Sequence, residues 1–359
     1  MSQQHTSEDR VRIGISVGDI NGVGMEIILK SLADNRLFGE ITPIVYGSSK
    51  LASYYRKVLQ MNEFNFHLIN SATEAQKNKA NLVQVWNEEM NITPGEATSL
   101  GGKYAFQSLE AAVKDLASGK IDVLVTAPIN KLVMQSDQFK FPGHTEYLAS
   151  IAGVDEALMM MVGGSLRVGL VTAHVPLKEV STLITKDKII RTAQRMNQSL
   201  IRDFGIRKPR IAVLGINPHA GENGLLGEED RNVIEPAINA LRNEGIMAFG
   251  PYAADGLFGS GNFRNFDGIL AMYHDQGLTP FKALSFDEGV NFTAGLPVVR
   301  TSPDHGTAYD LAGKGSASEA SFRNAIYLAK DVFLNRKFYK EINSNPLQPQ
   351  VKAERNERE

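Results

Sequence analysis

Three of the seven histidines share one position in the chain, because each comes soon after a predicted buried strand. They are His174, His219 and His274, which follow RVGLVT, RIAVLGI and FDGILAMY respectively. In open α/β sheets, ligands bind beyond the carboxyl ends of the strands, so three strands could bring these imidazoles together there. Three neutral imidazoles suit a borderline divalent metal ion.

The same histidines also have a purely structural interpretation. An imidazole at a strand end can hydrogen-bond the backbone of the following loop without binding any ligand. Two carboxylates stand in similar loops, Asp275 beside His274 and Asp255 in Ala-Ala-Asp-Gly. Either could be a metal ligand or an acceptor for a ligating histidine, and either could equally be a turn or capping carboxylate.

A second set of residues is suited to binding an anion. Gly143-His144-Thr145-Glu146 precedes a helical pattern, so we expect Thr145 to cap that helix and its N-terminus to bind phosphate or carboxylate. Three further polar residues follow the last strand-end histidine: Lys282, Asn291 and Arg300. Arginine offers the bidentate geometry that phosphate prefers. Each residue alone is typical of a solvated surface, and only their clustering beside the histidines favours an anion site.

The elements that must position these residues alternate along the chain. Short apolar runs and longer helical patterns follow one another, which is typical of α/β proteins built from βαβ units. The predicted strands are Arg12–Val17, Ile121–Thr126, Arg167–Thr172, Arg210–Ile216 and Phe266–Tyr273. Predicted helices begin at Met25, include Phe106–Leu116 before the stop signal Ser118-Gly119, and occupy about Ser318–Leu334.

None of the glycine-rich segments matches a nucleotide-binding fingerprint. Gly18–Gly24 follows a strand and opens a helix, but its spacing is not GxGxxG, and a tight turn explains it equally well. Gly259-Ser260-Gly261 has Arg264 where a third glycine would stand, and Gly313-Lys314 lacks the spacing of a P-loop. The residues alone therefore do not indicate a Rossmann-type or P-loop site.

The composition excludes several classes of protein. The 359 residues carry 38 Lys and Arg against 40 Asp and Glu, so no basic surface for nucleic acid is expected. The absence of cysteine excludes disulfides, thiolate nucleophiles and iron–sulfur clusters. No apolar run is long enough for a membrane span, and residues 1–10 are polar, unlike a signal peptide. We expect a soluble cytoplasmic protein of about two domains that binds neither nucleic acid nor membrane.

Taken together, the motifs resemble one family, the 4-hydroxythreonine-4-phosphate dehydrogenases of pyridoxal phosphate biosynthesis. The resemblance extends from Arg12 to Ala329. It is carried, in chain order, by GDINGVGMEI, TAPINK, GHTEYLA, TAHVPL, NPHAGENG, YHDQG and GVNFTAGLPVVRTSPDHGTA. One such motif would be weak evidence, whereas the ordered set is highly specific.

The resemblance implies an α/β fold similar to isocitrate and isopropylmalate dehydrogenases, with two α/β/α domains and the active site in the cleft between them. The expected first domain comprises residues 11–135 and 277–340, the second residues 136–276, and residues 1–10 and 343–359 are expected to be flexible tails. The resemblance also implies a homodimer with a shared active site, NAD(P), and a divalent metal. That metal would be zinc, or magnesium, cobalt or manganese according to availability.

Carried over position by position, the resemblance implies a role for each candidate residue. The metal ligands would be His174, His219 and His274, one of them donated across the dimer. A small phosphorylated amino acid would contact His144, Thr145, Lys282, Asn291 and Arg300. The dinucleotide would bind the segment HGTAYD through His305, Gly306, Thr307 and Asp310. The predicted catalytic base is either Lys282 or a water molecule linked to an aspartate, Asp275.

The predicted reaction is metal-assisted oxidation of 4-phosphooxy-L-threonine by NAD(P)+, after which the β-keto acid loses CO2 to give 3-amino-2-oxopropyl phosphate. The chain departs from the family's usual Pro-Ala at Ile20-Asn21, and many members have Gly at Asn223 and His at Leu225. Relatives that oxidise phosphorylated threonate or erythronate share much of the motif set, so a sister dehydrogenase is an alternative. More distant alternatives are a three-histidine metallohydrolase of a phosphoester and a non-catalytic ligand-binding protein.

Overall fold

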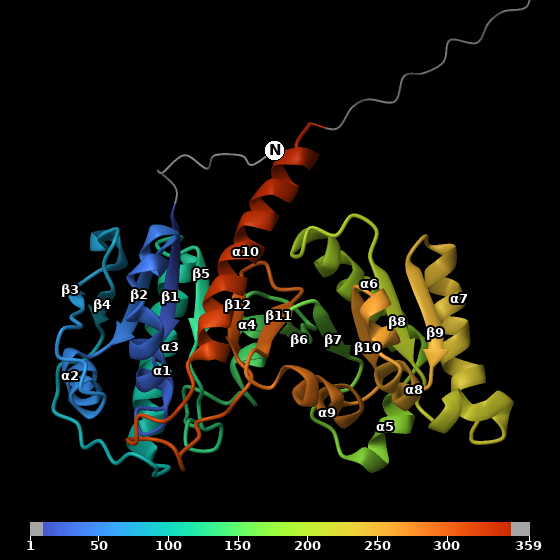
Figure 1. The fold of residues 1–359 in the computed structure, drawn as a ribbon, viewed down its shortest axis with the longest axis horizontal. Helices are drawn as coiled ribbons and strands as arrows, with labels where there is room; N and C mark the ends of the chain where they lie inside the picture. Colours follow the sequence, from blue (N-terminus) through green and yellow to red (C-terminus); the bar gives the residue numbers. More distant parts are fainter. Residues whose placement is uncertain (1–9, 346–359) are drawn as a thin grey trace, which may run out of the picture.

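The structure is a computed structural model that describes residues 10–345, and in this part of the chain twelve strands form one sheet (Figure 1). The strand order across the sheet is β3-β4-β2-β1-β5-β12-β11-β6-β7-β10-β8-β9. In chain order the strands are β1 (Val11–Ser16), β2 (Ile41–Gly47), β3 (His67–Ile69), β4 (Asn81–Gln84), β5 (Val123–Thr126), β6 (Leu158–Gly163), β7 (Leu166–Leu170), β8 (Arg210–Leu214), β9 (Met247–Tyr252), β10 (Gly268–Ala271), β11 (Val290–Ala294) and β12 (Arg300–Pro303).

Helices cover both faces of this sheet. They are α1 (Gly24–Leu32), α2 (Ser49–Val58), α3 (Ser99–Ala117), α4 (His144–Ile151), α5 (Leu177–Leu183), α6 (Lys186–Arg202), α7 (Glu235–Asn243), α8 (Ala254–Gly259), α9 (His274–Ser285) and α10 (Ala320–Asn343). Shorter helical turns are Asn35–Gly39, Ala72–Glu74, Asp230–Ile234 and Asn262–Asn265. Over residues 10–345, no helix has the length and apolar character that crossing a membrane requires.

The predicted elements are present, with shifted ends. The five predicted strands are β1, β5, β7, β8 and β10, and the predicted α/β class is confirmed. As expected, Ser118-Gly119 ends α3, with Gly119 in the left-handed region. α10 continues to Asn343, beyond the expected Leu334, and its last turns expose Phe338 and Ile342. Because those turns bury no continuous apolar face, the sequence pattern did not mark them as helix.

The sheet is parallel at both ends and antiparallel in the middle, which the alternating pattern did not predict. β11 is antiparallel to both β12 and β6, and β6 is antiparallel to β7. The connection from β6 to β7 consists only of Gly164 and Ser165, with Gly164 at a φ of 55°. So short a connection joins only antiparallel neighbours, because parallel strands need a long crossover.

Alternate residues of each strand serve opposite faces of the sheet. In β8, Ile211 and Val213 belong to one core, and Ala212 and Leu214 belong to another. On the first face, one continuous core runs under α1, α2, α10, α6 and α7, and so beneath both halves of the sheet. On the second face the core is divided, with α3 and α4 over β2 and β5 and with α8 and α9 over β7, β8 and β10. The middle of the sheet therefore lies in a gap between two helical covers.

These two halves correspond only in part to the domains that the resemblance implies. α4, expected in the second domain, packs with α3 in the first half. Residue 277, an expected boundary, lies inside α9, which packs on β7 and β10. The division into residues 11–135 with 277–340 and 136–276 stays a prediction. The expected flexible tails fall almost wholly outside the described residues.

Asp203, directly after α6, joins the two halves on the continuous face. It is fully buried, and its carboxylate accepts hydrogen bonds from Arg202 Nε at 2.8 Å and from Arg336 Nε of α10 at 2.7 Å. Ser199 Oγ donates to the same carboxylate at 2.7 Å, and Asn335 Nδ2 donates to its backbone oxygen at 2.9 Å. Burial raises the pKa of Asp203, but the hydrogen bonds from the two arginines outweigh it and hold the pKa below its ordinary 3.8.

Replacing Asp203 by alanine (D203A) is expected to lower the free energy of unfolding by about 3–5 kcal/mol, because two largely buried guanidinium groups lose their carboxylate. The folded-state pKa lies below the unfolded one, so this contribution is present at neutral pH and is lost as the pH falls below about 4. Denaturant unfolding of wild type and variant, at neutral pH and again below about pH 4, measures this difference in the free energy of unfolding. Asp187→Ala, at the exposed start of α6, is the control, and an equal loss in both variants would contradict the assignment.

Candidate functional site

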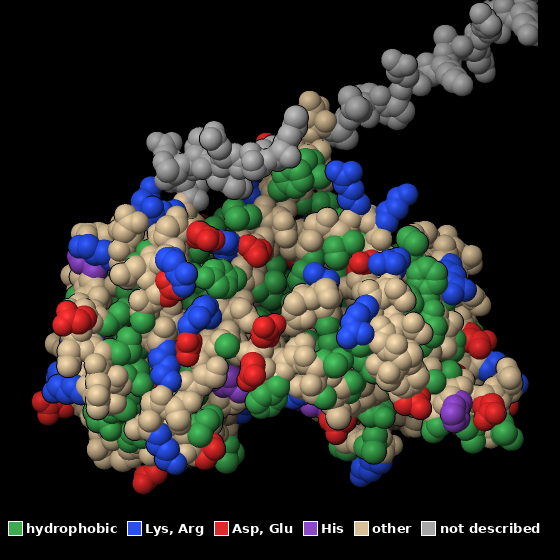
Figure 2. Space-filling view, in the orientation of Figure 1, with side chains coloured by type: hydrophobic (Ala, Val, Ile, Leu, Met, Phe, Trp, Pro, Cys, Tyr) green, Lys and Arg blue, Asp and Glu red, His purple; other side chains and the backbone are tan. Residues whose placement is uncertain are grey.

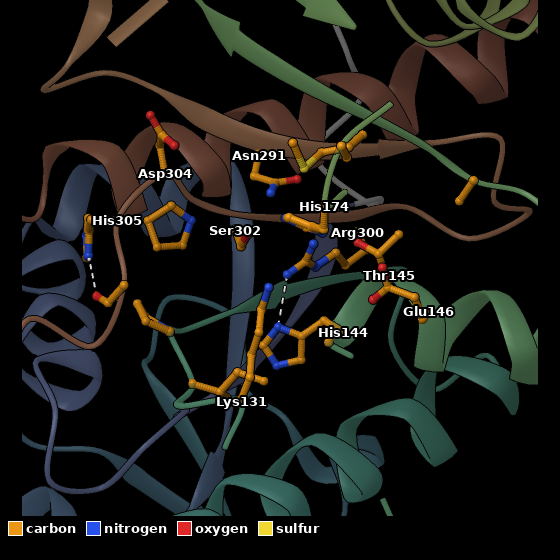
Figure 3. Close-up of a pocket in the computed structure, with 18 of the residues that line it drawn as sticks. Lys131, His144, Thr145, Glu146, His174, Asn291, Arg300, Ser302, Asp304 and His305 are labelled. Carbon is orange, nitrogen blue, oxygen red and sulfur yellow. Dashed lines mark hydrogen bonds between the residues drawn. The ribbon is translucent and has the colours of Figure 1, made fainter. Parts of the chain in front are cut away.

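The main cavity, so called because most of the predicted site residues line it, lies in the gap between the two helical covers, over the middle of the sheet. Its volume is about 380 Å³, and Figure 2 shows the molecule hollowed at its lower margin between the two halves. The walls come from the carboxyl ends of β5, β7 and β12, from β6 and β11, and from the start of α4. Its polar side chains are Lys131, His144, Thr145, Glu146, His174, Asn291, Arg300, Ser302, Asp304 and His305 (Figure 3).

The pleat of β11 and β12 explains why polar groups face this cavity. Arg300 and Ser302 of β12 both line it. Thr301, between them, points to the opposite face, where its hydroxyl donates to the backbone oxygen of Ala325 in α10 at 2.7 Å. Asn291 is the register partner of Ser302 on β11, and it lies on the cavity side as well.

The guanidinium group of Arg300 is buried among neutral partners. Nε and Nη2 donate to Thr126 Oγ1 at 3.1 and 2.7 Å, and Nη1 donates to Thr293 Oγ1 at 3.3 Å. Nη2 also contacts His144 Nδ1 at 3.0 Å. Burial lowers the pKa of Arg300 to about 10, so the group is still charged at neutral pH. None of the ion pairs among residues 10–345 includes Arg300, and a buried cation in this state favours an anionic ligand.

His144, beside Arg300, carries a further hydrogen-bond donor on its second ring nitrogen. Arginine can only donate, so Nδ1 of His144 accepts from Arg300 and the proton of the neutral ring is on Nε2. Nε2 is buried and has no hydrogen-bond partner among the described residues. Burial, then the charges of Arg300 and Lys131, lower the pKa of His144 well below 6.5. The residue therefore stays neutral at physiological pH and offers one unused N–H.

The predicted helix cap at Thr145 is wrong. The residue before the first turn of α4 is Gly143, in an extended conformation, and no side chain caps the helix. Thr145 is the second helical residue, and its hydroxyl lies 3.4 Å from Thr293 Oγ1. A capping side chain must come from the non-helical residue that precedes the helix, so Thr145 has no such role. It still lines the cavity, as expected of a substrate contact.

Sequence reasoning gave no role to three charged residues of the cavity, Lys131, Glu146 and Asp304. Lys131 follows β5 and Asp304 follows β12. These two stand just past a strand end, the position by which the histidines were chosen, so the signal was available. Among the predicted residues, Asn291 does line the cavity, and its Oδ1 is buried with no partner in the described structure.

Lys282, in α9, reaches the cavity wall only through Asp304. Its Nζ lies 3.4 Å from both Oδ1 and the backbone oxygen of Asp304. Burial raises the pKa of Asp304, against the lowering effect of the Lys282 charge. An ammonium paired with a carboxylate is a poor proton acceptor, so this contact does not favour Lys282 as the base.

Two of the strand-end histidines lie together. The ring centroids of His174 and His274 are 6.0 Å apart, and the strands they follow, β7 and β10, are parallel neighbours. Burial, then the charge of Lys131, lower the pKa of His174, which keeps it in the neutral form that ligates metals. His274 Nδ1 lies 2.7 Å from Asp275 Oδ1, which leaves Nε2 as the nitrogen for a ligand. This contact fits an orienting role for the exposed Asp275, and the catalytic role predicted for it stays a prediction.

His219 does not join this pair, so the expectation that three histidines of one chain converge is wrong. It lines a second cavity with Glu222, Arg231 and Glu235. β8 is also a neighbour of β10, yet the segment after it turns away, because residues 219–224 all have positive φ, from 42° to 98°. In the part of the chain that the structure describes, no group of three or more ligand-type side chains could hold a metal.

Buried Asp230 holds this left-handed segment in place. Its carboxylate accepts hydrogen bonds from the backbone N–H of Ile216 at 2.8 Å and of Asn217 at 3.2 Å, and from Asn217 Nδ2 at 3.0 Å. Gly221 packs so closely that a Cβ there would lie 2.9 Å from the backbone oxygen of Gly227. Left-handed backbone costs an L-residue roughly 1–2 kcal/mol, so these contacts are needed to keep His219 where it is.

The segment expected to bind the dinucleotide packs on the glycine turn before α1. The backbone oxygen of Thr307 accepts from Val23 N–H at 3.0 Å, and a Cβ on Gly22 would come within 2.9 Å of that oxygen. Tyr309 Oη donates to the buried Asp19 at 2.7 Å. Gly18–Gly24 is thus a support for this segment. Two of the four predicted dinucleotide contacts, His305 and Gly306, line the main cavity, and the other two, Thr307 and Asp310, lie outside it.

Asn21 strengthens this support. It is fully buried, and its Nδ2 donates to Glu96 O at 3.1 Å and to Thr98 Oγ1 at 2.9 Å. Its Oδ1 accepts from the backbone N–H of Thr93 at 3.0 Å. Residues 93–98 are thereby fixed beside the same segment, since a Cβ on Gly95 would lie 3.0 Å from Tyr309 O.

Comparison with known proteins identifies the family. The family model described as "Pyridoxal phosphate biosynthetic protein PdxA" matches residues 40–329. The 4-hydroxythreonine-4-phosphate dehydrogenase of Bacteroides thetaiotaomicron is 52% identical over 351 residues, which cover 98% of this chain and 96% of that relative. The chain belongs to the PdxA family. It is therefore an oxidoreductase acting on a CH–OH group, and membership of this dehydrogenase family implies a nicotinamide cofactor.

Solved PdxA-family structures share its fold. The 4-hydroxythreonine-4-phosphate dehydrogenase of Klebsiella pneumoniae superposes with a TM-score of 0.78 at 35% identity, covering 92% of this chain and 99% of that one. The one from Burkholderia phymatum gives 0.75 at 39%, covering 90% and 99%. A further relative, the D-threonate 4-phosphate dehydrogenase of Cupriavidus necator, is 42% identical over 318 residues, covering 88% of this chain and 95% of the relative.

His144 is expected to be uncharged, with its proton on Nε2, at neutral pH. Nitrogen-15 spectra of the imidazole ring measure both the charge and the tautomer. Burial and the neighbouring cations lower its pKa, so protonation would require a pH well below the ordinary value of 6.5. Titration of His144 near pH 6.5, or a proton on Nδ1, would contradict the described contact with Arg300.

Proposed function

We propose that this chain oxidises 4-phosphooxy-L-threonine with NAD(P)+ in the biosynthesis of pyridoxine 5′-phosphate. The observation that carries the proposal is the buried Arg300 guanidinium, which has no carboxylate partner among the described residues and shares one cavity with His174. A phosphorylated substrate supplies the missing anion, and the histidine pair stands where the reacting carbon would be. The family membership supports the same substrate class.

The phosphoryl group is held by side chains that donate hydrogen bonds. Arg300 supplies the charge, His144 supplies its unused Nε2–H, and Thr145 supplies a hydroxyl. Asn291 differs, because its unpartnered Oδ1 is an acceptor. It suits the ammonium or hydroxyl group of the substrate.

His174 and His274 could each supply one nitrogen ligand to a divalent metal ion, because their imidazole rings lie close together and His274 Nε2 is not engaged by Asp275. The third ligand would be His219 of the partner subunit in a homodimer, since His219 is carried on an exposed loop away from the site of its own chain. The metal would be zinc, or magnesium, cobalt or manganese. When bound, it would stabilise the alkoxide that forms as the hydroxyl loses its proton.

The proton of the substrate hydroxyl passes to Asp304, which lines the cavity and whose pKa is raised by burial. The ammonium group of Lys282 lies beside Asp304 and holds that carboxylate in place. His305, Gly306, Thr307 and Asp310 would hold the dinucleotide, which would supply the hydride acceptor needed to convert the alcohol to a ketone. The β-keto acid then loses its carboxylate as CO2, the electron pair passes into the new carbonyl, and protonation gives 3-amino-2-oxopropyl phosphate.

A sister substrate, phosphorylated threonate or erythronate, is the second candidate. It is favoured by the relative named D-threonate 4-phosphate dehydrogenase and by the altered residues Asn223 and Leu225. Both residues lie in or beside the left-handed segment that carries His219. The cytoplasmic location predicted from the sequence stays a prediction.

The substrate assignment is tested by NAD(P)H formation, measured by absorbance, with and without a chelator. Chelator-sensitive turnover of 4-phosphooxy-L-threonine is expected, and it should exceed turnover of the phosphorylated threonate and erythronate tested in parallel. Faster turnover of either of these would establish the sister reaction. Phosphate release without any nucleotide would establish the hydrolase instead.

Subunit mixing tests the shared site. His174→Ala and His219→Ala are each expected to abolish turnover and to weaken metal binding. A mixed dimer of the two variants keeps one intact site, because it combines a complete His174–His274 pair with an unaltered His219 of the partner subunit. Equal mixing and subunit exchange should restore roughly a quarter of wild-type activity. Mixtures as inactive as the single variants would show that His219 does not cross between subunits.

A further inference from the structure

Lys131 carries an unpaired charge on the wall of the main cavity. None of the ion pairs within residues 10–345 includes its ammonium group, although an exposed lysine of the same segment, Lys140, pairs with Asp137. Glu146 lies close by, because a Cβ on Gly143 would be 3.3 Å from Glu146 Oε2 and 3.9 Å from Lys131 Nζ, but the two residues form no ion pair in the described structure. The Lys131 side chain is therefore exposed to the cavity and forms no ion pair that would stabilise the fold.

The position of Lys131 is nevertheless fixed. Asn130 Oδ1 accepts from the backbone N–H of Leu132 at 3.0 Å, which shapes the turn around Lys131. The same segment is anchored further on by Met134 and Phe139, both almost fully buried in the core under α3 and α4. A rigid turn thus presents a flexible, charged side chain to the cavity.

Lys131 and Arg300 approach the same point from different elements. The aliphatic part of Lys131 passes over the start of α4, since a Cβ on Gly143 would lie 3.4 Å from Lys131 Cε. In Figure 3 the side chain runs beside His144 toward the Arg300 guanidinium. The charges of both residues lower the pKa of His144, after burial, so both act on the same imidazole. The carboxylate of Glu146 attracts Arg300 but forms no ion pair with either cation within residues 10–345, so an anion bound between Lys131 and Arg300 would relieve their mutual repulsion.

We propose that Lys131 contacts the phosphoryl group of the substrate and supplies the second positive charge of its binding site. This inference rests on the proposed function, which places a phosphorylated substrate in this cavity. A phosphate monoester carries nearly two negative charges at neutral pH, and Arg300 alone balances one of them. The ammonium of Lys131 balances the other, and its flexible stem lets it follow the phosphoryl group during the reaction.

The test is calorimetric titration of inorganic phosphate into the full-length protein at constant ionic strength, without nucleotide. Lys131→Met removes the charge and keeps the length, and about tenfold to hundredfold weaker phosphate binding is expected. Lys131→Arg should stay within a few fold of wild type. Lys140→Met, in the same segment but outside the cavity, is the matched control and should bind like wild type. Equal melting temperatures show that all variants are folded.

Kinetics separate this role from a structural one. Lys131→Met should raise KM for 4-phosphooxy-L-threonine and leave KM for NAD(P)+ unchanged, and inhibition by L-threonine, which lacks the phosphoryl group, should not change. Unaltered phosphate binding, equal losses in the methionine and arginine variants, or weaker inhibition by L-threonine would each overturn the inference. Phosphate binding that depends on Lys131 in a wild-type protein with no turnover would support the anion site while refuting the proposed function.

Discussion

The buried charge of Arg300 is the interaction on which the rest of the site depends. Its strand partners supply hydroxyl groups, and α4 supplies a neutral imidazole, so every nitrogen is positioned although no carboxylate among the described residues forms an ion pair with the guanidinium. A carboxylate in place of Thr126 would neutralise the guanidinium and remove its attraction for an anion. The fold therefore orients the arginine with neutral hydrogen-bond partners, and its positive charge is available to pair with an anionic ligand.

The uneven cover of the sheet makes this arrangement possible. On one face α10 lies across the central strands, and Thr301 bonds to its backbone. On the other face α3 with α4 and α8 with α9 stand apart, and the side chains of β11 and β12 between them are polar. Because a strand alternates its side chains between faces, one short strand serves both the core and the site. Arg300 and Thr301 are adjacent residues with opposite roles.

The sequence predicted the parts of this structure that depend on local pattern. Apolar runs located the strands β1, β5, β7, β8 and β10, and the motif order identified the family. Strand-end position correctly paired His174 with His274, because β7 and β10 are neighbours. It failed for His219, since the left-handed segment after β8 depends on a distant carboxylate, Asp230, that no local pattern indicates. The antiparallel position of β11 between β12 and β6 was missed for a similar reason, because strand order is a property of long-range pairing.

The continuous core beneath α1, α10, α6 and α7 has a consequence for how the molecule unfolds. A chain of this length is commonly expected to melt as two bodies, each with a core of its own. Here the apolar side chains of both halves on that face belong to one cluster, and α10 is shared between them. Loss of either half exposes the core of the other, so heat or denaturant should disrupt them in a single cooperative transition. The cleft thus lies on one face only, and it does not divide the molecule into two parts that unfold separately.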